Sequence, residues 1–150
     1  MNRSTSRSTI KLTDTQYKYC VKITNKMSNF SIAEYFLCPV DINEHPDYLN
    51  KVKKPMDLGK VLEKLESHQY STLNDWKNDM NSIWKNAFAY NEQDTVVYMI
   101  AEELQKKFKE MADLIPLSKD EEWVYKMKKI HNKFQRILQS KPSDSQNNAK

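Results

Sequence analysis

The sequence predicts an all-α protein, and three observations support this prediction. First, the 150 residues include one glycine and five prolines, whereas β-rich and α/β folds usually need more glycine for their turns. Second, good helix formers such as Leu, Lys, Glu, Met and Gln are frequent. Third, apolar residues recur at helical spacing in several segments. A chain of this length can form one domain with a hydrophobic core.

The first predicted helix covers residues 14–30 and is followed by a long irregular connection. Side chains that suit a buried face recur in this helix at helical spacing, from Tyr17 through Cys20 to Met27. Residues 34–54 lack such periodicity, and their prolines work against a continuous helix. A connection this long inside a compact domain is usually functional, so it is the first place to expect a binding site.

Three more helices are predicted before Pro116. Asp57 is expected to cap a short helix with an apolar face. The Ser-Thr pair at residues 71–72 is expected to cap a long helix that runs to about Tyr90, because the sequence there approximates a capping box. Asp94 is expected to cap the next helix.

A further amphipathic helix is predicted over residues 116–139, as an addition to the preceding bundle. The run Ser118-Lys-Asp-Glu121 is a capping box, and apolar residues then alternate by four and three. This apolar stripe must pack against either the same bundle or a partner. The stripe consists of Trp123, Met127, Ile130, Phe134 and Ile137.

The polar segments 1–13 and 140–150 are expected to be disordered tails.

The net charge of +4 is unevenly distributed. Residues 1–22 carry five Lys/Arg and one Asp, and residues 117–150 carry eight Lys/Arg and four Asp/Glu. The centre, residues 23–116, carries eleven Lys and fifteen Asp/Glu. An acidic centre suits a cationic peptide partner, and basic flanks suit weak phosphate contacts. Ordinary solvated surface is the alternative interpretation of the same pattern.

Several functional classes lack support in the sequence. No apolar run approaches the roughly 20 residues of a membrane span, and the N-terminal segment lacks the apolar region of a signal peptide. Cys20 and Cys38 make no disulfide framework, which favours a reduced intracellular compartment, and the histidines show no metal-ligand spacing. No nucleophile–base pair, HExxH motif or glycine-rich phosphate loop is present. We therefore expect no membrane association, no metal, no cofactor and no enzymatic activity.

Several short motifs occur along the chain in one order: Val40, Pro46-Asp-Tyr48, Pro55-Met-Asp-Leu-Gly59, the break at residues 70–71 and Tyr90-Asn91. In this order and spacing they resemble a bromodomain over about residues 14–115. The resemblance implies a left-handed four-helix bundle. It also implies an acetyl-lysine pocket formed by the long connection and the short loop at Asn91.

The chemistry of acetyl-lysine explains the roles that this resemblance implies. The side chain is a neutral amide on an aliphatic stem, so its recognition needs an apolar slot and a hydrogen-bond donor. Asn91 is expected to donate its amide N–H to the acetyl carbonyl, and Tyr48 to reach the carbonyl through a water. Unmodified lysine is rejected because its ammonium group would lose its hydration without gaining a carboxylate partner. The acetyl-lysine-binding residues expected are Asn91, Tyr48, Val40, Phe36, Val97 and Tyr90.

Each of these residues also has a structural interpretation. Asn91 is a plausible helix C-cap, since Asn tolerates the left-handed conformation. Tyr48 is a plausible half-buried loop residue with its hydroxyl at the surface. The apolar residues Val40, Phe36 and Val97 are as consistent with ordinary core positions as with a ligand wall. Tyr90 is expected to pack beside the pocket and order the end of its helix.

The sequence departs from the family pattern at the pocket rim, where Glu34, Tyr35, His45 and Glu92 are expected. The run Glu34-Tyr-Phe36 stands where many bromodomains carry Trp-Pro-Phe, so an apolar shelf loses its indole and gains a carboxylate. His45 stands near positions often held by leucine; it either makes affinity depend on pH near 6–7 or is exposed and inert. Glu92 follows Asn91 where proline is common. These changes bear on which residues are preferred beside the acetylated lysine.

Three functional hypotheses follow from the sequence. The first is a monomeric nuclear reader of acetylated lysine on histone tails or other nuclear proteins, with an acidic rim that speeds association with lysine-rich peptides. The second is a degenerate bundle with an unused pocket, whose C-terminal helix docks a partner in a chromatin complex. The third is weak, sequence-independent nucleic-acid binding by the basic flanks, which is compatible with the first.

Overall fold

The computed structural model describes residues 11–140, and this part of the chain contains seven helices and no strand. The predicted all-α class is confirmed. Contacts divide the chain into two compact units, residues 1–115 and residues 116–150. The first unit contains α1 (Asp14–Ser28), η1 (Ser31–Phe36), α2 (Tyr48–Lys51), α3 (Leu58–Glu66), α4 (Leu73–Tyr90) and α5 (Val96–Ala112). The second contains α6 (Lys119–Gln139).

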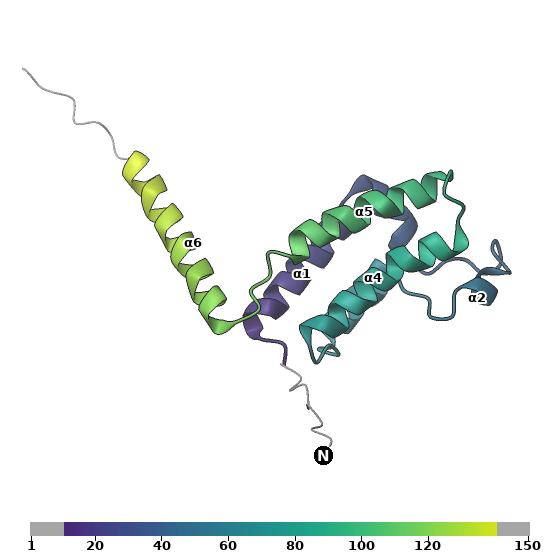
Figure 1. The fold of residues 1–150 in the computed structure, drawn as a ribbon, viewed down its shortest axis with the longest axis horizontal. Coiled ribbons are helices and arrows are strands. Elements are labelled where there is room, and N and C mark those ends of the chain that lie inside the picture. The colour runs from purple at the N-terminus through teal and green to yellow at the C-terminus, as the bar shows by residue number, and fades with distance from the viewer. Residues whose placement is uncertain (1–10, 141–150) are drawn as a thin grey trace, which may run out of the picture. The chain divides into compact units, whose positions relative to one another are not determined.

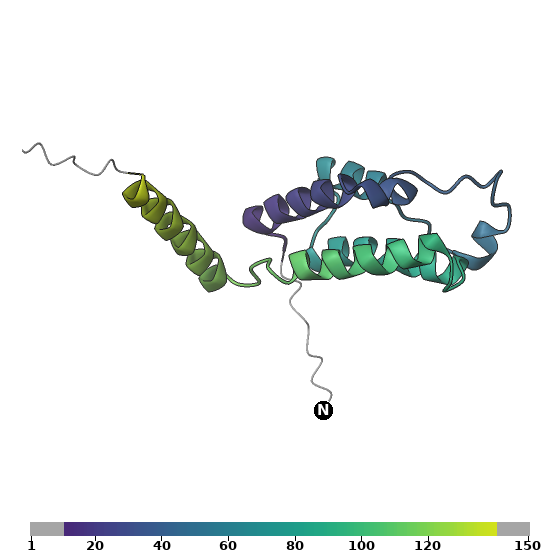
Figure 2. The ribbon, with the colours of Figure 1, turned by 90° about the horizontal axis from the view of Figure 1, so that it is seen from above.

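The four longer helices of the first unit form a bundle around one hydrophobic core. Helix α4 packs against α5, and α1 packs against both α3 and α5 (Figures 1 and 2). Each helix buries one face, as its apolar spacing predicts. Helix α4 contributes the largest buried side chains, Trp76 and Trp84, both 0% exposed. The remaining core residues include Cys20, Ile23, Met27, Leu58, Val61, Leu65, Met80, Ile83, Ala101, Leu104 and Phe108.

A buried hydrogen-bonded pair ties α1 to α4 inside this core. The Thr24 hydroxyl donates to the carbonyl of Cys20 at 2.8 Å and accepts from the Trp76 indole Nε1 at 3.1 Å. Both polar groups are therefore satisfied without water, which removes the cost of burying them.

Side-chain caps define where most of the helices begin. Capping boxes form at Thr13 for α1 and at Thr72 for α4, and the Asp57 carboxylate accepts from the backbone N–H of Lys60 at the start of α3. Helix α5 is capped by Thr95, whose hydroxyl accepts from the backbone N–H of Tyr98, and not by Asp94 as the sequence suggested. Both residue types cap well, so sequence alone does not choose between adjacent candidates.

The N-terminal boundary of the first unit lies before Asp14. Residues 1–10 of the predicted tail 1–13 lie outside the described residues. Within residues 11–13, the Leu12 N–H donates to the carbonyl of Ser71 at 2.9 Å, and Leu12 packs against the core. Leu12 and Thr13 thus belong to the bundle. At the other end, Ser140 caps α6, and residues 141–150 lie outside the described part.

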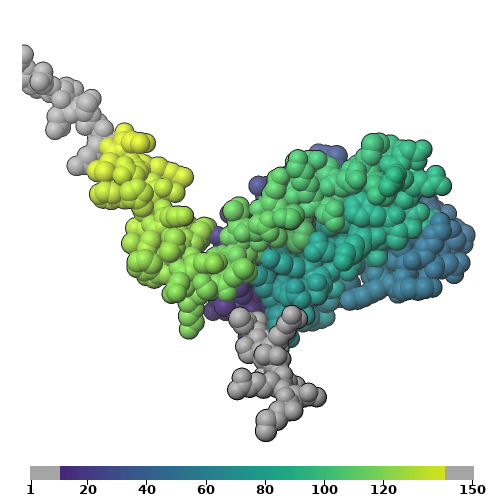
Figure 3. Space-filling view, in the orientation of Figure 1, coloured from purple at the N-terminus to yellow at the C-terminus, as the bar shows by residue number. Residues whose placement is uncertain are grey.

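The predicted irregular connection contains η1 and α2, and the loop of residues 37–57 is fixed at both ends. At its start, the Gly59 N–H donates to the carbonyl of Leu37 at 3.1 Å. At its end, the Asn86 side chain on α4 donates to the carbonyl of Lys54 at 2.9 Å. Figures 1 and 2 both place α2 at the end of the bundle where α4 leads into α5, and Figure 3 shows the atoms of this segment packed against that end. The loop is therefore held over one end of the bundle.

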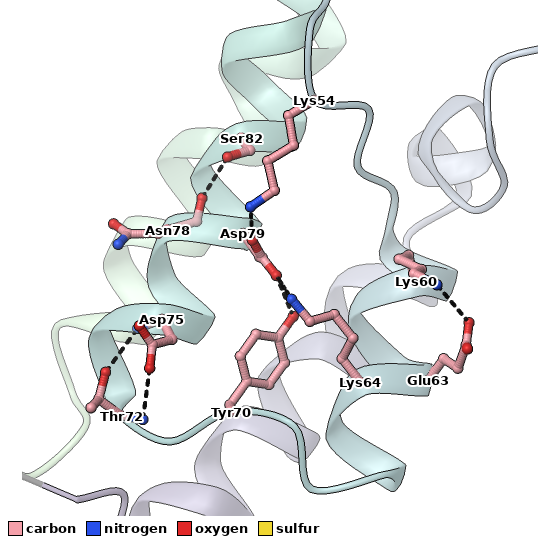
Figure 4. A network of polar contacts seen from close by, with 10 residues as sticks. All are labelled: Lys54, Lys60, Glu63, Lys64, Tyr70, Thr72, Asp75, Asn78, Asp79 and Ser82. Atoms are coloured by element: carbon pink, nitrogen blue, oxygen red, sulfur yellow. Dashed lines mark hydrogen bonds and ion pairs between the residues drawn. The ribbon is translucent and has the colours of Figure 1, made fainter.

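A polar network centred on Asp79 also holds this loop and α3 against α4 (Figure 4). Asp79 is 4% exposed and accepts from the Tyr70 hydroxyl at 3.0 Å and the Lys54 ammonium at 3.3 Å. It also forms an ion pair with Lys64 of α3. Burial raises the pKa of the Asp79 carboxyl, but these three donors outweigh burial and leave the pKa below its ordinary value.

Helix α6 begins at a Ser118 cap, whose hydroxyl accepts from the backbone N–H of Glu121 at 3.1 Å. It covers Lys119–Gln139 of the predicted segment 116–139, and none of its residues is buried within the described chain. Among the described residues, no helix is both long and apolar enough to span a membrane.

Candidate functional site

A cavity of about 350 Å³ lies between the loop of residues 37–57 and the adjoining parts of α4 and α5. This volume falls at the lower end of the ~300–1,000 Å³ typical of small-ligand sites. All of the residues predicted from the sequence line it except Glu92, which is exposed beyond the end of α4. The lining residues are Glu34, Tyr35, Phe36, Cys38, Pro39, Val40, Asp41, Glu44, His45, Tyr48, Met56, Asp57, Ile83, Ala87, Tyr90, Asn91 and Val97.

Asn91 ends α4 and lines the cavity with a partly buried side chain. Its backbone is extended, with φ −96° and ψ 147°, so the left-handed C-cap interpretation does not apply. Its side-chain Nδ2 donates one hydrogen bond to the carbonyl of Ala87 at 2.9 Å, which fixes the orientation of the carboxamide. A primary amide carries two N–H groups, so a second donor is left for a ligand.

Tyr48 is the first residue of α2 and is 6% exposed. The side chain lines the cavity, and its hydroxyl makes no hydrogen bond within residues 11–140. The hydroxyl is not among the fully buried unsatisfied atoms, so it faces the open space of the cavity. Burial of the residue, and secondarily the negative charge of Asp57, raises the pKa of Tyr48, so the hydroxyl stays protonated near neutral pH. A donor that faces the cavity without a protein partner is available to a ligand or a water there.

Apolar side chains form the walls and floor of the cavity. Phe36 is 7% exposed and packs edge-on against Trp84, with ring centroids 5.5 Å apart. Val40 from the loop and Val97 from α5 are partly buried and line the same space. Phe36 is therefore both core and lining, which explains why the sequence left these two interpretations open.

Ile83 and Ala87 are lining residues that the sequence analysis did not select. They precede Asn91 by two turns and one turn of α4, so they share its face of the helix. Their spacing of eight and four residues from Asn91 could have identified them as lining residues from the sequence. Met56 and Asp57 also line the cavity, although the sequence suggested only a helix-capping role for Asp57 and a place in a motif for Met56.

Hydrogen bonds and ring contacts fix Tyr90 at the rim. Its hydroxyl donates to Asp47 at 2.9 Å and lies within hydrogen-bond distance, 3.2 Å, of His45 Nδ1. Its ring packs edge-on against Tyr48, with centroids 5.0 Å apart, and Lys51 lies over it at 5.2 Å. The hydrogen bond to Asp47 is the main cause that raises the pKa of Tyr90. Tyr90 therefore connects the end of α4 to the middle of the loop.

Other hollows in the first unit fit a binding role less well. A cavity of about 330 Å³ lies beside Tyr17, His68 and Tyr70. The Tyr17 hydroxyl donates to the carbonyl of Leu65 and the Tyr70 hydroxyl to Asp79, so these donors are already satisfied. The described residues contain no cluster of three or more His, Cys, Asp or Glu side chains arranged for a metal ion. The cavity beside Asn91 is the stronger candidate.

Comparison with known proteins agrees with this geometry. A family model described as Bromodomain matches residues 20–103. This chain belongs to the bromodomain family. Bromodomains are in general acetyl-lysine readers that occur in chromatin and transcription factors, and they are typically non-catalytic modules.

Relatives of this bromodomain are named as chromatin and transcription proteins. It is 35% identical over 103 residues to a nucleosome-remodeling factor subunit NURF301-like of Caenorhabditis elegans, covering 69% of this chain and 5% of that protein. It is 36% identical over 103 residues to the SWR1 complex bromodomain subunit bdf1 of Schizosaccharomyces pombe, covering 67% of this chain and 18% of that protein. It is 44% identical over 78 residues to the transcription factor GTE1 of Arabidopsis thaliana, covering 50% of this chain and 20% of that protein. The chain thus spans a small part of each of these relatives.

Proposed function

We propose that this bromodomain is a non-catalytic reader of acetylated lysine on histone tails or other nuclear proteins, acting in the nucleus as a monomer. The observation that carries the proposal is the pair of donors in an apolar cavity. Asn91 retains one amide N–H beyond its bond to Ala87, and the Tyr48 hydroxyl, in a residue that is 6% exposed, makes no hydrogen bond within residues 11–140.

In this proposal the acetyl carbonyl accepts a hydrogen bond from Asn91 directly and from Tyr48 through a water. The aliphatic stem lies between Val40 and Val97, and Phe36 forms the floor. An unmodified lysine binds more weakly, because its ammonium group loses its hydration in a slot with apolar walls and two donors. Asp57, the buried carboxylate among the lining residues, already accepts from the backbone N–H of Lys60.

The experiment is a calorimetric titration with matched histone-tail peptides that differ only in acetylation. Wild type is compared with Asn91→Ala and with Asn78→Ala, an exposed α4 residue outside the cavity lining, as control. Loss of the Asn91 donor should cost about 1–3 kcal/mol, or roughly ten- to a hundredfold in affinity. The control should bind like wild type.

Three outcomes would count against the reader mechanism. Equal binding of acetylated and unmodified peptides would indicate charge attraction by the acidic rim. Acetyl-dependent binding that is insensitive to Asn91 would place recognition elsewhere. Absence of binding to any acetylated peptide would favour a protein-interaction module that does not use the pocket and docks a partner through α6.

A weak, sequence-independent contact with nucleic acid is a secondary proposal for α6. From Trp123 to Ser140 this helix carries Lys126, Lys128, Lys129, Lys133 and Arg136, all exposed, and no acidic residue. Such contacts should weaken steeply with salt concentration. A DNA titration at two salt concentrations tests this, and binding that does not depend on salt would contradict it.

A further inference from the structure

The mouth of the acetyl-lysine cavity carries charges of one sign. Among its lining residues, Glu34, Asp41 and Glu44 are exposed carboxylates, and no lysine or arginine is present. The three carboxylates come from two segments: Glu34 lies in η1, and Asp41 and Glu44 lie in the loop. The entrance is therefore negative around an interior that is mainly apolar.

These charges are not neutralised by the described part of the protein. None of the three carboxylates forms an ion pair within residues 11–140. Asp41 accepts one hydrogen bond, from the backbone N–H of Asn43 at 2.8 Å, which leaves its charge in place. Of the nearby cations, Lys51 lies over the Tyr90 ring at 5.2 Å and is not a lining residue. The negative charge is therefore available to a ligand.

The position of Tyr48 indicates which part of a ligand lies at the mouth. Tyr48 is 6% exposed and lines the cavity, and its hydroxyl makes no hydrogen bond within residues 11–140, so it can bind the polar end of a ligand in the interior. An acetyl-lysine that places its amide there leaves its backbone and neighbouring residues crossing the mouth. In an extended peptide, the second residue on either side lies about 6–7 Å away along the chain, within reach of the rim.

Glu34 and Tyr35 together suit a cationic neighbour. Both line the cavity, and the Tyr35 ring is 57% exposed. At the same mouth, an exposed carboxylate attracts an ammonium or guanidinium group by charge, and an exposed aromatic ring attracts it through its face. This pair occupies the place where many bromodomains carry an apolar Trp-Pro shelf, so the feature concerns this chain's own residues.

We infer that this bromodomain selects an acetylated lysine that has an unmodified lysine or arginine within about two residues. The inference rests on the proposed function and names the ligand class of the same site. It has a consequence for multiply modified tails: a second acetyl group on the neighbouring lysine removes the charge that the mouth recognises. Such doubly acetylated peptides bind more weakly than singly acetylated ones.

The test is calorimetry with synthetic Gly/Ser peptides of about nine residues, each with a central acetyl-lysine. The second residue on each side is lysine, glutamine or acetyl-lysine. Wild type is compared with the charge-neutral variant Glu34→Gln/Asp41→Asn/Glu44→Gln and with Glu110→Gln, an exposed α5 carboxylate outside the cavity lining. Circular dichroism melting checks that all variants are folded.

Wild type and Glu110→Gln should prefer the lysine-flanked peptide by roughly three- to tenfold over the other two, the effect of one or two exposed ion pairs. The charge-neutral variant should lose most of this preference while it still requires the acetyl group. Equal affinities in wild type, or an unchanged preference in the charge-neutral variant, would overturn the inference. If no acetylated peptide binds, or binding ignores Asn91→Ala, the proposed function fails as well, which separates the two failures.

Discussion

Replacement of Asp79 by alanine should destabilise the bundle far more than loss of any surface ion pair. Asp79 is 4% exposed, and its removal leaves the Tyr70 hydroxyl, itself in a residue that is 7% exposed, without an acceptor. A hydrogen bond to a charged group is worth about 1.5–3 kcal/mol. Removal of the Asp79 carboxylate also leaves the Lys64 ammonium without its ion-pair partner, on a side chain that is only 22% exposed.

The contribution of Lys54 is smaller, because its side chain is 72% exposed and water screens the pair to about 0–1 kcal/mol. The total expected for Asp79→Ala is therefore about 3–5 kcal/mol, the range for breaking a buried ion pair from one side. Asp79→Asn should cost less, about 1–3 kcal/mol, since the amide oxygen still accepts from Tyr70.

Urea denaturation followed by circular dichroism measures the free energy of unfolding for both variants. The control is Glu63→Gln, whose partner Lys60 is 52% exposed and whose own side chain is 63% exposed, so its change should stay within about 0.5 kcal/mol. A loss from Asp79→Ala no larger than that of the control would refute the reasoning.

The same carboxylate makes stability depend on pH. Because the pKa of Asp79 is lower in the folded protein than its ordinary value, its contribution is fully present above the unfolded pKa. It is lost as pH falls through the folded pKa, so wild type should lose stability below about pH 4. Asp79→Asn should show a flatter acid limb in the same denaturation experiment. Parallel pH profiles for the two proteins would contradict this assignment.

Three further predictions concern the loop and the cavity. Tyr48→Phe should lower affinity for an acetylated peptide by roughly two- to tenfold in calorimetry, with a melting temperature close to wild type because the hydroxyl has no partner among the described residues; an unchanged affinity would exclude a role for that hydroxyl. Gly59→Ala should cost about 1–3 kcal/mol in urea denaturation, because its Cβ would lie 2.6 Å from the backbone oxygen of Leu37; a neutral result would mean that the contact relaxes freely. An alkylating reagent should modify the exposed Cys38 and spare the buried Cys20, because burial raises the pKa of Cys20 to about 12. Acetylated peptide should slow the reaction at Cys38, because Cys38 lines the cavity. Mass spectrometry measures both rates, and an unchanged Cys38 rate at saturating peptide would argue against occupancy of the cavity.

The helices could be predicted from the sequence because their signals are local. Periodic apolar residues and caps such as Thr72 and Ser118 lie within a few residues of the structure that they specify. The error at the start of α5 was of the same local kind, a choice between Asp94 and its neighbour Thr95.

The loop's internal structure could not be predicted, because its contacts are distant in sequence. Residues 34–54 were expected to be irregular, whereas η1 and α2 form there and are held by partners such as Asn86 and Tyr90 of α4. Similarly, nothing in the local sequence marks Asp79 as a buried residue. Its burial depends on Tyr70 and on lysines from two other segments, which no local pattern reveals.

For the candidate site, the resemblance supplied the residue identities and the structure adds their hydrogen-bonding state. Nothing in the sequence indicates that the Asn91 amide already makes one bond to Ala87, or that the Tyr48 hydroxyl makes none in the described chain. These two states depend on side-chain orientation across the bundle, and they decide which donors remain for a ligand.

A double-mutant cycle measures whether Asn91 reads the acetyl group. The dissociation constants of wild type and Asn91→Ala are measured by calorimetry for one peptide in its acetylated and unmodified forms. We expect a coupling of about 1–3 kcal/mol between the acetyl group and the Asn91 side chain. Additive effects, with no coupling between the two changes, would mean that Asn91 does not read the acetyl group.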